Sequence, residues 1–168
     1  HRLGAELLPS IQRWKQPYAV VDFDPGIVRA LTERGIRAWY GDASEAEFLE
    51  EIGLSEADMV ISTVPEAGVH RAILSKVRRG TSGAIVVLVA SSVEQSLKLY
   101  KEGATYVINL HDVAGNYAAL ILDRCQGEQK RFALERRKHV AQLKKHEGRE
   151  ILPSSPMHTP MQDRKSVV

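Results

Sequence analysis

Short apolar segments alternate with amphipathic segments along the first 125 residues of the chain. Runs of Val, Ile, Leu and aromatic residues bounded by turn residues are typical of buried strands. Five segments have this character: residues 18–23, 36–40, 58–63, 84–90 and 105–110. The intervening segments carry apolar residues three and four positions apart, which predicts helices. These lie over residues 25–35, 44–53, 64–80, 91–103 and 112–125. Strands and helices alternating at this spacing predict a parallel, doubly wound α/β sheet.

Capping residues support the predicted helices. Asp24 precedes the helix at 25–35 and is interpreted as its cap, and Ser91 or Ser92 caps the helix at 91–103. Ser44 is followed three residues later by Glu47, which is the capping-box pattern. These residues satisfy backbone N–H groups that a helix leaves without partners at its start.

The pattern changes after residue 125. Residues 126–150 favour a helix and are strongly charged, with a thin apolar stripe. Residues 151–168 contain three prolines and no periodicity, which predicts disorder. The expected organisation is therefore one α/β domain at 1–125, a charged helical extension at 126–150 and a disordered tail at 151–168.

Charge is spread unevenly along the 168 residues. Residues 1–126 carry 13 Lys and Arg against 16 Asp and Glu, and residues 127–168 carry 10 against 5. The basic tail is interpreted first as a solvated extension, with contact to anionic lipid or an acidic partner as the alternative. Because its one aromatic residue is Phe132, a nucleic-acid partner is not expected.

Composition excludes several further classes. A single cysteine, Cys125, rules out a disulfide within the chain and fits a reducing compartment. The longest apolar run, residues 84–90, is too short to span a bilayer. No signal-peptide pattern stands at the N-terminus.

Small and polar residues follow the predicted strands at the end where parallel sheets bind ligands. Asp22 ends the first strand, and its carboxylate suits both hydroxyls of a ribose while repelling a 2′-phosphate. Asp42 and Ala43 follow the second strand and suit an adenine edge. Thr63, after the third strand, lies toward the phosphates. The sequence therefore predicts a nucleotide crevice, against the alternative that each acid is a surface turn.

Evidence for catalysis is weaker. The sequence has no Ser/His/Asp arrangement with elbow glycines and no HExxH motif. His70 follows Glu66 by one helical turn, a spacing that suits a metal or a proton but is more common for a pair on a helix surface. Cys125 is expected to be buried rather than reactive.

Several motifs resemble a known family, the RCK or KTN nucleotide-binding domain, also called TrkA-N. They are "VVDFDP", "GDAS", "EEIGLSEADMVISTVPE" and "GATYVI", while "NLHDVAGNYAALIL" is closest to the version found in Kef-type monovalent cation:proton antiporters. The resemblance covers roughly residues 3–125. It implies a Rossmann-like fold and a ligand such as NAD(H), AMP, ADP or ATP. The implied ligand contacts are Asp22, Gly41, Asp42, Ala43, Thr63 and Glu66.

The resemblance also implies a role. The domain would be a ligand sensor without a reaction of its own, forming a homodimer or higher oligomer through the helix at 112–125. Its partner would be a membrane-embedded cation transporter domain upstream in the same chain. The location would be cytoplasmic, at the inner face of the cell membrane.

The sequence departs from the family pattern in three places. His70 stands where the family usually has Asn, and no clear TrkA-C domain follows. The first strand and its Gly-x-Gly-x-x-Gly loop are missing, and "HRLGAELL" matches the helix that comes after that loop. In the strand order 3-2-1-4-5-6 the missing strand is central, which leaves a slot between the strands at 18–23 and 58–63. We expect that the natural chain continues upstream, with the alternative that another segment fills the slot.

Three functions compete at this point. The first is a nucleotide-sensing regulatory domain of a potassium or other monovalent cation transport system. The second is a fragment of an NAD-dependent oxidoreductase, which is disfavoured because no Lys, Tyr or His is placed with a partner as a proton donor. The third is an α/β scaffold that binds partners without nucleotide, against which Asp22 and Asp42 at consecutive strand ends are the main argument.

Overall fold

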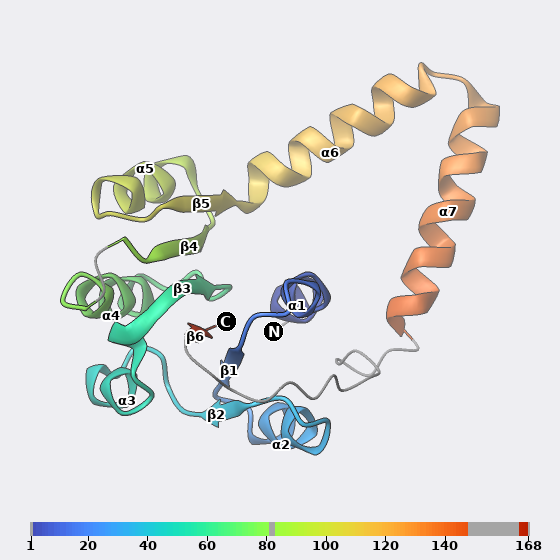
Figure 1. The fold of residues 1–168 in the computed structure, drawn as a ribbon. Helices are drawn as coiled ribbons and strands as arrows, with labels where there is room; N and C mark the ends of the chain where they lie inside the picture. Colours follow the sequence, from blue (N-terminus) through green and yellow to red (C-terminus); the bar gives the residue numbers. More distant parts are fainter. Residues whose placement is uncertain (1, 81–82, 148–164, 168) are drawn as a thin grey trace.

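A computed structural model describes residues 2–80, 83–147 and 165–167 of the chain (Figure 1). The strands are β1 Tyr18–Asp22, β2 Ala38–Tyr40, β3 Ala57–Ser62, β4 Ile85–Ala90, β5 Tyr106–Asn109 and β6 Lys165–Val167. The helices are α1 Arg2–Arg13, α2 Pro25–Glu33, α3 Ala46–Glu51, the 3₁₀ turn η1 Leu54–Glu56, α4 Ala67–Val77, α5 Val93–Lys101, α6 Leu110–Cys125 and α7 Gln129–Glu147.

The strands form one parallel sheet in the order β2-β1-β6-β3-β4-β5. Figure 1 shows α3, α4 and α5 on one side of this sheet and α1 and α2 on the other. Each predicted strand is present, shorter by one or more residues than its apolar run in most cases. The predicted Rossmann-like parallel α/β architecture is therefore confirmed.

The central slot of the sheet is occupied by β6. This strand pairs with β1 through Tyr18 and Ala19 and with β3 through residues 57, 59 and 60. Of the two expectations for the slot, the structure shows another segment filling it. The reason is physical: β1 and β3 each present a row of backbone N–H and C=O groups, and an extended segment satisfies both rows at once.

The strand β6 corrects part of the predicted tail. Disorder was expected over 151–168, whereas Lys165–Val167 is a parallel strand. The rest of that prediction, residues 151–164 and 168, lies outside the described part of the chain. The predicted charged helix is present as α7, which begins at Gln129.

Two apolar clusters hold the helices on the sheet. The larger one joins β3, β4 and β5 to α3, α4 and α5, and Leu88 at its centre is fully buried. The smaller one joins Leu8 of α1 and Leu31 of α2 with Ile36. The unbroken apolar run predicted for β4 is thus buried through most of its length, as a strand covered on both faces requires.

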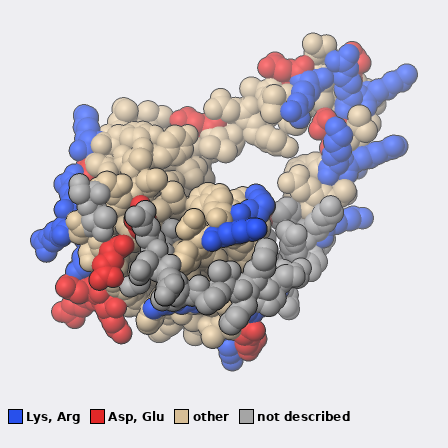
Figure 2. Space-filling model, viewed as in Figure 1, with Lys and Arg blue, Asp and Glu red and all other residues tan. Residues whose placement is uncertain are grey.

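Two long helices leave this body. Figure 1 shows α6 extending away from β5 and α7 running from its far end in a different direction, and Cys125 at the turn is fully buried, as predicted. Figure 2 shows many Lys and Arg side chains on this arm, while the visible face of the body carries both basic and acidic side chains. Among the described helices, none combines the length and apolar character that crossing a membrane requires.

The predicted caps are confirmed at two helices and wrong at one. The Asp24 carboxylate accepts from the backbone N–H groups of Gly26 (2.7 Å) and Ile27 (3.4 Å), and Ser92 caps α5. Ser44 does not cap α3, which begins at Ala46 with Glu45 as its cap residue and no side-chain capping bond. Ser44 instead donates its backbone N–H to the Asp42 carboxylate at 2.7 Å, so the chain forms a turn before the helix starts.

Replacing Asp24 by alanine is expected to lower the free energy of unfolding by about 1 kcal/mol, the usual cost of losing a helix N-cap. Urea denaturation followed by circular dichroism measures this change. Ser44→Ala is the matched control, because Ser44 caps no helix, and it should cost less than about 0.5 kcal/mol. Equal losses in the two variants would contradict the assignment of Asp24 as the cap.

Candidate functional site

A cavity of about 290 Å³ lies at the carboxyl ends of β1 and β3. All six residues predicted to contact a ligand border it: Asp22, Gly41, Asp42, Ala43, Thr63 and Glu66. They come from three strand ends and the turns that follow them. The structure therefore brings the predicted contacts together around one space.

The cavity lies beyond the described pairs that β6 makes with its neighbours. β6 pairs with only the first two residues of β1, and its pairing with β3 stops at Val60. Val20–Asp22 and Ile61–Ser62 continue past the last described residue of β6, and both segments border the cavity. Side chains from helices on both faces of the sheet, such as Leu8 and Ile73, close the space. Its inner wall is consequently apolar.

Asp22 lies half-buried at the end of β1. Its carboxylate accepts from the backbone N–H of Asp24 at 2.9 Å, and its backbone carbonyl accepts from the N–H of Gly41 at 3.2 Å. The second bond ties the end of β1 to the end of β2, and the first holds the carboxylate against the turn that leads into α2. The carboxylate of Asp22 is thereby held at the mouth of the cavity beside the turn that carries Asp42.

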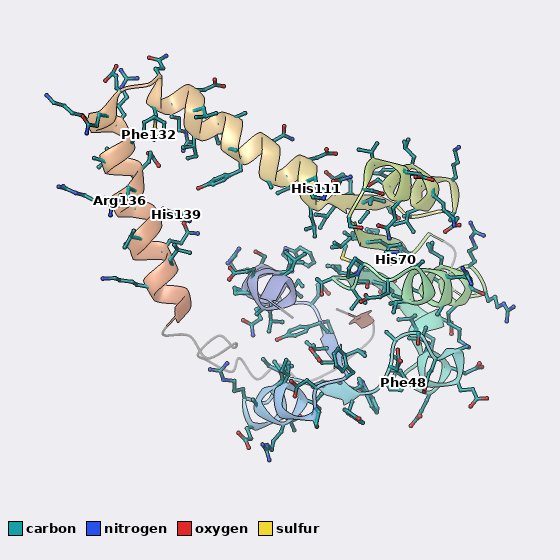
Figure 3. All side chains as sticks on the ribbon, turned by 180° about the vertical axis from the view of Figure 1, so that it is seen from behind. Phe48, His70, His111, Phe132, Arg136 and His139 are labelled. Atoms are coloured by element: carbon teal, nitrogen blue, oxygen red, sulfur yellow. The ribbon has the colours of Figure 1, made fainter. Side chains whose placement is uncertain are left out.

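The turn after β2 begins with Gly41, and the ring of Phe48 packs directly over it. A Cβ built on Gly41 would lie 2.7 Å from the Cδ2 atom of Phe48 and closer still to the outer atoms of that ring. Phe48 comes from α3 and is seen there in Figure 3. The close approach of this ring packs α3 against the turn and so fixes the position of Asp42 and Ala43 at the cavity.

The exposed carboxyl group of Asp42 is stabilised in its charged form. The backbone N–H of Ser44, and to a smaller extent its side chain, hydrogen-bond to the carboxylate and lower the pKa of Asp42 below its ordinary value. The carboxylate of Asp42 therefore remains ionised at neutral pH. Among the residues that border the cavity in the described part of the chain, three are acidic and none is Lys, Arg or His.

Besides the end of β1 and the turn after β2, the cavity is bordered by the loop Thr63–Glu66, which connects β3 to α4. A Cβ on Gly4 of α1 would come within 3.5 Å of the Thr63 hydroxyl, so the first turn of α1 lies against this loop. A helix N-terminus carries partial positive charge. Among the described residues that border the cavity, backbone N–H groups at the start of α1 are the groups available for an anionic part of a ligand.

The predicted surface pair of Glu66 and His70 is wrong, because His70 is only 1% exposed and faces the core. Its Nε2 atom lies 2.8 Å from the carbonyl oxygen of Val64. In the described residues no group of three or more His, Cys, Asp or Glu side chains is placed to hold a metal ion. The spacing of His70 with Val69, Ile73 and Val77, all buried on α4, is the signal that would have placed His70 on the inner face.

Taken together, the sheet order and the cavity at its carboxyl edge define the class of Rossmann-like nucleotide-binding folds. The sequence matches the TrkA-N domain over residues 1–110, and the chain belongs to this family. The resemblance seen in the sequence motifs is thereby confirmed.

Two of the curated relatives come from potassium-efflux systems. The chain is 24% identical over 84 residues to the glutathione-regulated potassium-efflux system protein KefC of Cronobacter sakazakii, and equally similar to KefC of Escherichia coli strain E24377A. The match covers 50% of this chain and 14% of each relative. The chain therefore corresponds to a small part of those proteins.

Solved structures share the fold. The TrkA-N domain of the inner membrane protein ybaL from Escherichia coli superposes with a TM-score of 0.61 at 24% identity, over 71% of this chain and 86% of that one. The GsuK channel bound to NAD gives a TM-score of 0.59 at 19% identity, over 70% of this chain and 21% of that one. GsuK bound to ADP gives 0.58 at 18% identity, over 74% and 32%.

Proposed function

We propose that this chain is a nucleotide-sensing regulatory domain of a potassium or other monovalent cation transport system. The observation that carries the proposal is the convergence of Asp22, Asp42 and Thr63 on one cavity at the carboxyl edge of a Rossmann-like sheet. A ligand bound there touches the ends of β1, β2 and β3 together. It changes a regulatory equilibrium to the extent that it binds one state of the domain more tightly than the other.

The relatives support the physiological setting. KefC is named a glutathione-regulated potassium-efflux system protein, and the GsuK channel has been solved with NAD and with ADP. By analogy, the partner of this domain is a membrane-embedded cation transporter domain, and the domain lies on the cytoplasmic side of the membrane.

The cavity supports an adenine nucleotide as the ligand. Its volume of about 290 Å³ is at the lower end of the range of small-molecule sites, which suits AMP, ADP or one half of NAD(H). Asp22 accepts from the ribose hydroxyls, and Asp42 with Ala43 meets the adenine. The apolar inner wall favours the base, while the three carboxylates disfavour an additional phosphate on the ribose.

Assembly involves α6. Val113, Tyr117 and Leu120 recur at helical spacing along this helix and are all exposed. A second copy of the chain packs against this apolar stripe, which gives a homodimer or a higher oligomer. Ligand binding in the body then reaches the partner through β5, which runs directly into α6.

The domain performs no reaction of its own. Among the described residues that border the cavity there is no Lys, Tyr, His or Cys that would supply a proton donor or a nucleophile. This composition supports a sensor over the alternative of an NAD-dependent oxidoreductase fragment.

Isothermal titration calorimetry with AMP, ADP, NADH and NADPH tests the proposal. We expect saturable binding of at least one of the first three and binding of NADPH weaker than that of NADH by at least about tenfold, because its 2′-phosphate would lie against Asp22. Absence of binding by all four would leave an α/β scaffold. Oxidation of bound NADH with an added carbonyl substrate would instead support the oxidoreductase.

A further inference from the structure

The loop Thr63–Glu66, which forms one wall of the cavity, is held from behind by two side chains that do not border the cavity. His70 of α4 contacts the backbone carbonyl of Val64 at 2.8 Å, and Gln95 of α5 donates to the carbonyl of Pro65 at 2.8 Å. Two consecutive carbonyl groups of the loop are thus held by two different helices. Neither contact was anticipated from the sequence.

His70 makes its contact in one protonation state of the ring. A carbonyl oxygen can only accept, so Nε2 carries the hydrogen and donates it to Val64. Nδ1 is then the bare nitrogen of a neutral imidazole. It is buried and has no hydrogen-bond partner among the described residues. Figure 3 shows His70 within the body of the protein, whereas His111 lies on α6 and His139 on α7.

Gln95 is fixed at both ends of its amide. Its Oε1 accepts from the backbone N–H of Ser91 at 2.9 Å and from the Ser91 hydroxyl at 3.1 Å. The carbonyl end of the amide is therefore engaged, and the NH₂ end is directed to Pro65. This side chain links the loop after β3 to the loop after β4.

We propose that His70 and Gln95 are positioning residues that hold the Thr63–Glu66 loop in its ligand-binding conformation, and that protonation of His70 releases the loop and weakens nucleotide binding. The inference rests on the proposed function of the cavity. It adds a regulation of that site by pH, carried by a group that the nucleotide does not touch.

The direction of the pH effect follows from the surroundings of the ring. Burial lowers the pKa of His70, and this outweighs the opposing effects of the Val64 carbonyl and of the negative charges of Glu66 and Glu102. A proton on Nδ1 would create a buried donor without an acceptor. When the loop moves away and water enters, the ring regains an ordinary pKa of about 6.5. Protons therefore bind preferentially to the released state.

The state in which His70 holds the loop is consequently favoured above about pH 6.5. Its population decreases as the pH falls through that value toward the lowered pKa of His70. Below the lowered pKa the loss is complete and the affinity becomes independent of pH again. Because one proton is involved, the affinity falls by at most about tenfold per pH unit in this range.

Calorimetric titration of the full chain with NAD between pH 5.5 and 8 tests the inference, because the pyrophosphate diester of NAD keeps its charge over this range. Wild type is expected to bind more weakly as the pH falls. His70→Gln keeps an amide donor for Val64 without a titratable group, so it should match wild type at pH 8 and lose most of the pH dependence. His70→Met removes the donor and should bind about two- to tenfold more weakly at pH 8.

Two further variants distinguish the role of His70 from the roles of Gln95 and of an exposed histidine. Gln95→Met should weaken NAD binding at pH 8 while keeping the pH dependence, because His70 is still present. His111→Gln is the matched control, since His111 is exposed at the start of α6, and it should leave both the affinity and its pH dependence unchanged. A pH dependence in His70→Gln equal to that of wild type would overturn the inference while the proposed function stands.

If wild type binds NAD at no pH, hydrogen exchange decides the inference without a ligand, and the proposed function is decided separately by the titrations with AMP, ADP and NADH. The amides of Thr63, Val64 and Glu66 should exchange faster in His70→Met than in wild type at the same pH. The ratio of wild-type to His70→Gln exchange rates should rise between pH 8 and pH 5.5. A ratio that stays constant would overturn the role of His70 protonation.

Discussion

Replacing Asp22 by alanine is expected to weaken the binding of AMP, ADP or NADH by about 100-fold. A carboxylate that accepts from two ribose hydroxyls forms two hydrogen bonds to a charged group, each contributing about 1.5–3 kcal/mol. Water recovers part of this in the variant, and about 2.7 kcal/mol corresponds to the 100-fold loss. Calorimetry with the same nucleotides measures it.

Asp22→Asn distinguishes the contribution of the negative charge to nucleotide affinity from that of the shape of the side chain. The amide keeps one acceptor oxygen and removes the negative charge, so it should bind NADH with a loss between those of wild type and Asp22→Ala. The variant should also reduce the discrimination against NADPH, because the repulsion of the 2′-phosphate is gone. The change in the NADH-to-NADPH affinity ratio is the measurement that tests the placement of the ribose.

Asp24→Ala serves as the control for both variants. Asp24 lies two residues away and carries the same charge, but its carboxylate is engaged in capping α2. It should lower stability and leave nucleotide affinity within about twofold of wild type at a temperature where the protein is folded. If Asp24→Ala and Asp22→Ala lost affinity equally, local unfolding of α2 would explain both results and the ribose contact would be refuted.

The sequence was sufficient to predict the elements whose signals are local. The unbroken apolar run of β4 and the polar residues after each strand predicted both the parallel sheet and the edge that carries the cavity. The six candidate contacts converge because parallel strands end at one edge of a sheet. To predict that they meet at one cavity, it was enough to know the number and the order of the strands.

The strand β6 could not be predicted in the same way. Lys165–Val167 is three residues long and follows a segment with no periodicity. Its strand conformation arises from pairing with β1 and β3, which are more than 100 residues away in the sequence. The sequence indicated that the central slot needed an occupant, and local patterns contain no information about which distant segment supplies it.

The start of α3 and the surroundings of His70 show the same limit at single residues. Ser44 has the spacing of a capping box, yet its own backbone N–H is taken by the Asp42 carboxylate in a local turn, and the helix starts at Ala46. His70 was interpreted by its distance from Glu66 along one helix. Its actual partner is a carbonyl of the preceding loop, a contact that depends on how α4 packs on the sheet.

Gly80→Ala is expected to lower the free energy of unfolding strongly. Among alanine substitutions at the glycines of α4 and of the turn that follows it, this one should have the largest effect. The sequence predicted a helix over residues 64–80, of which Gly80 is the last residue, and the structure shows a close contact at this position. A Cβ on Gly80 would lie 2.6 Å from the carbonyl carbon and 2.7 Å from the Cα of Ser55 in η1, and closer still to the Ser55 oxygen. These are backbone atoms, so no side-chain rotation relieves the clash.

The end of α4 and η1 must therefore separate to accept the methyl group. That movement disturbs Leu54, which is almost fully buried beside Ser55, and Val77 at the end of α4. Overpacking of this kind costs about 1–3 kcal/mol and more where the backbone shifts, so we expect a loss of about 3 kcal/mol. Stabilities of single domains are about 5–15 kcal/mol, which makes this loss large enough to measure by urea denaturation.

Gly68→Ala is the matched control within the same element. Gly68 lies in the first turn of α4, and a Cβ built on it meets no atom within 4 Å. Alanine is favoured over glycine in a helix by up to about 1 kcal/mol, so this variant should be as stable as wild type or slightly more stable. Opposite signs for the two substitutions are the expected result. If Gly80→Ala were as stable as wild type, the backbone at Gly80 would not pack against the backbone of Ser55. The close contact between the end of α4 and η1 would then be refuted.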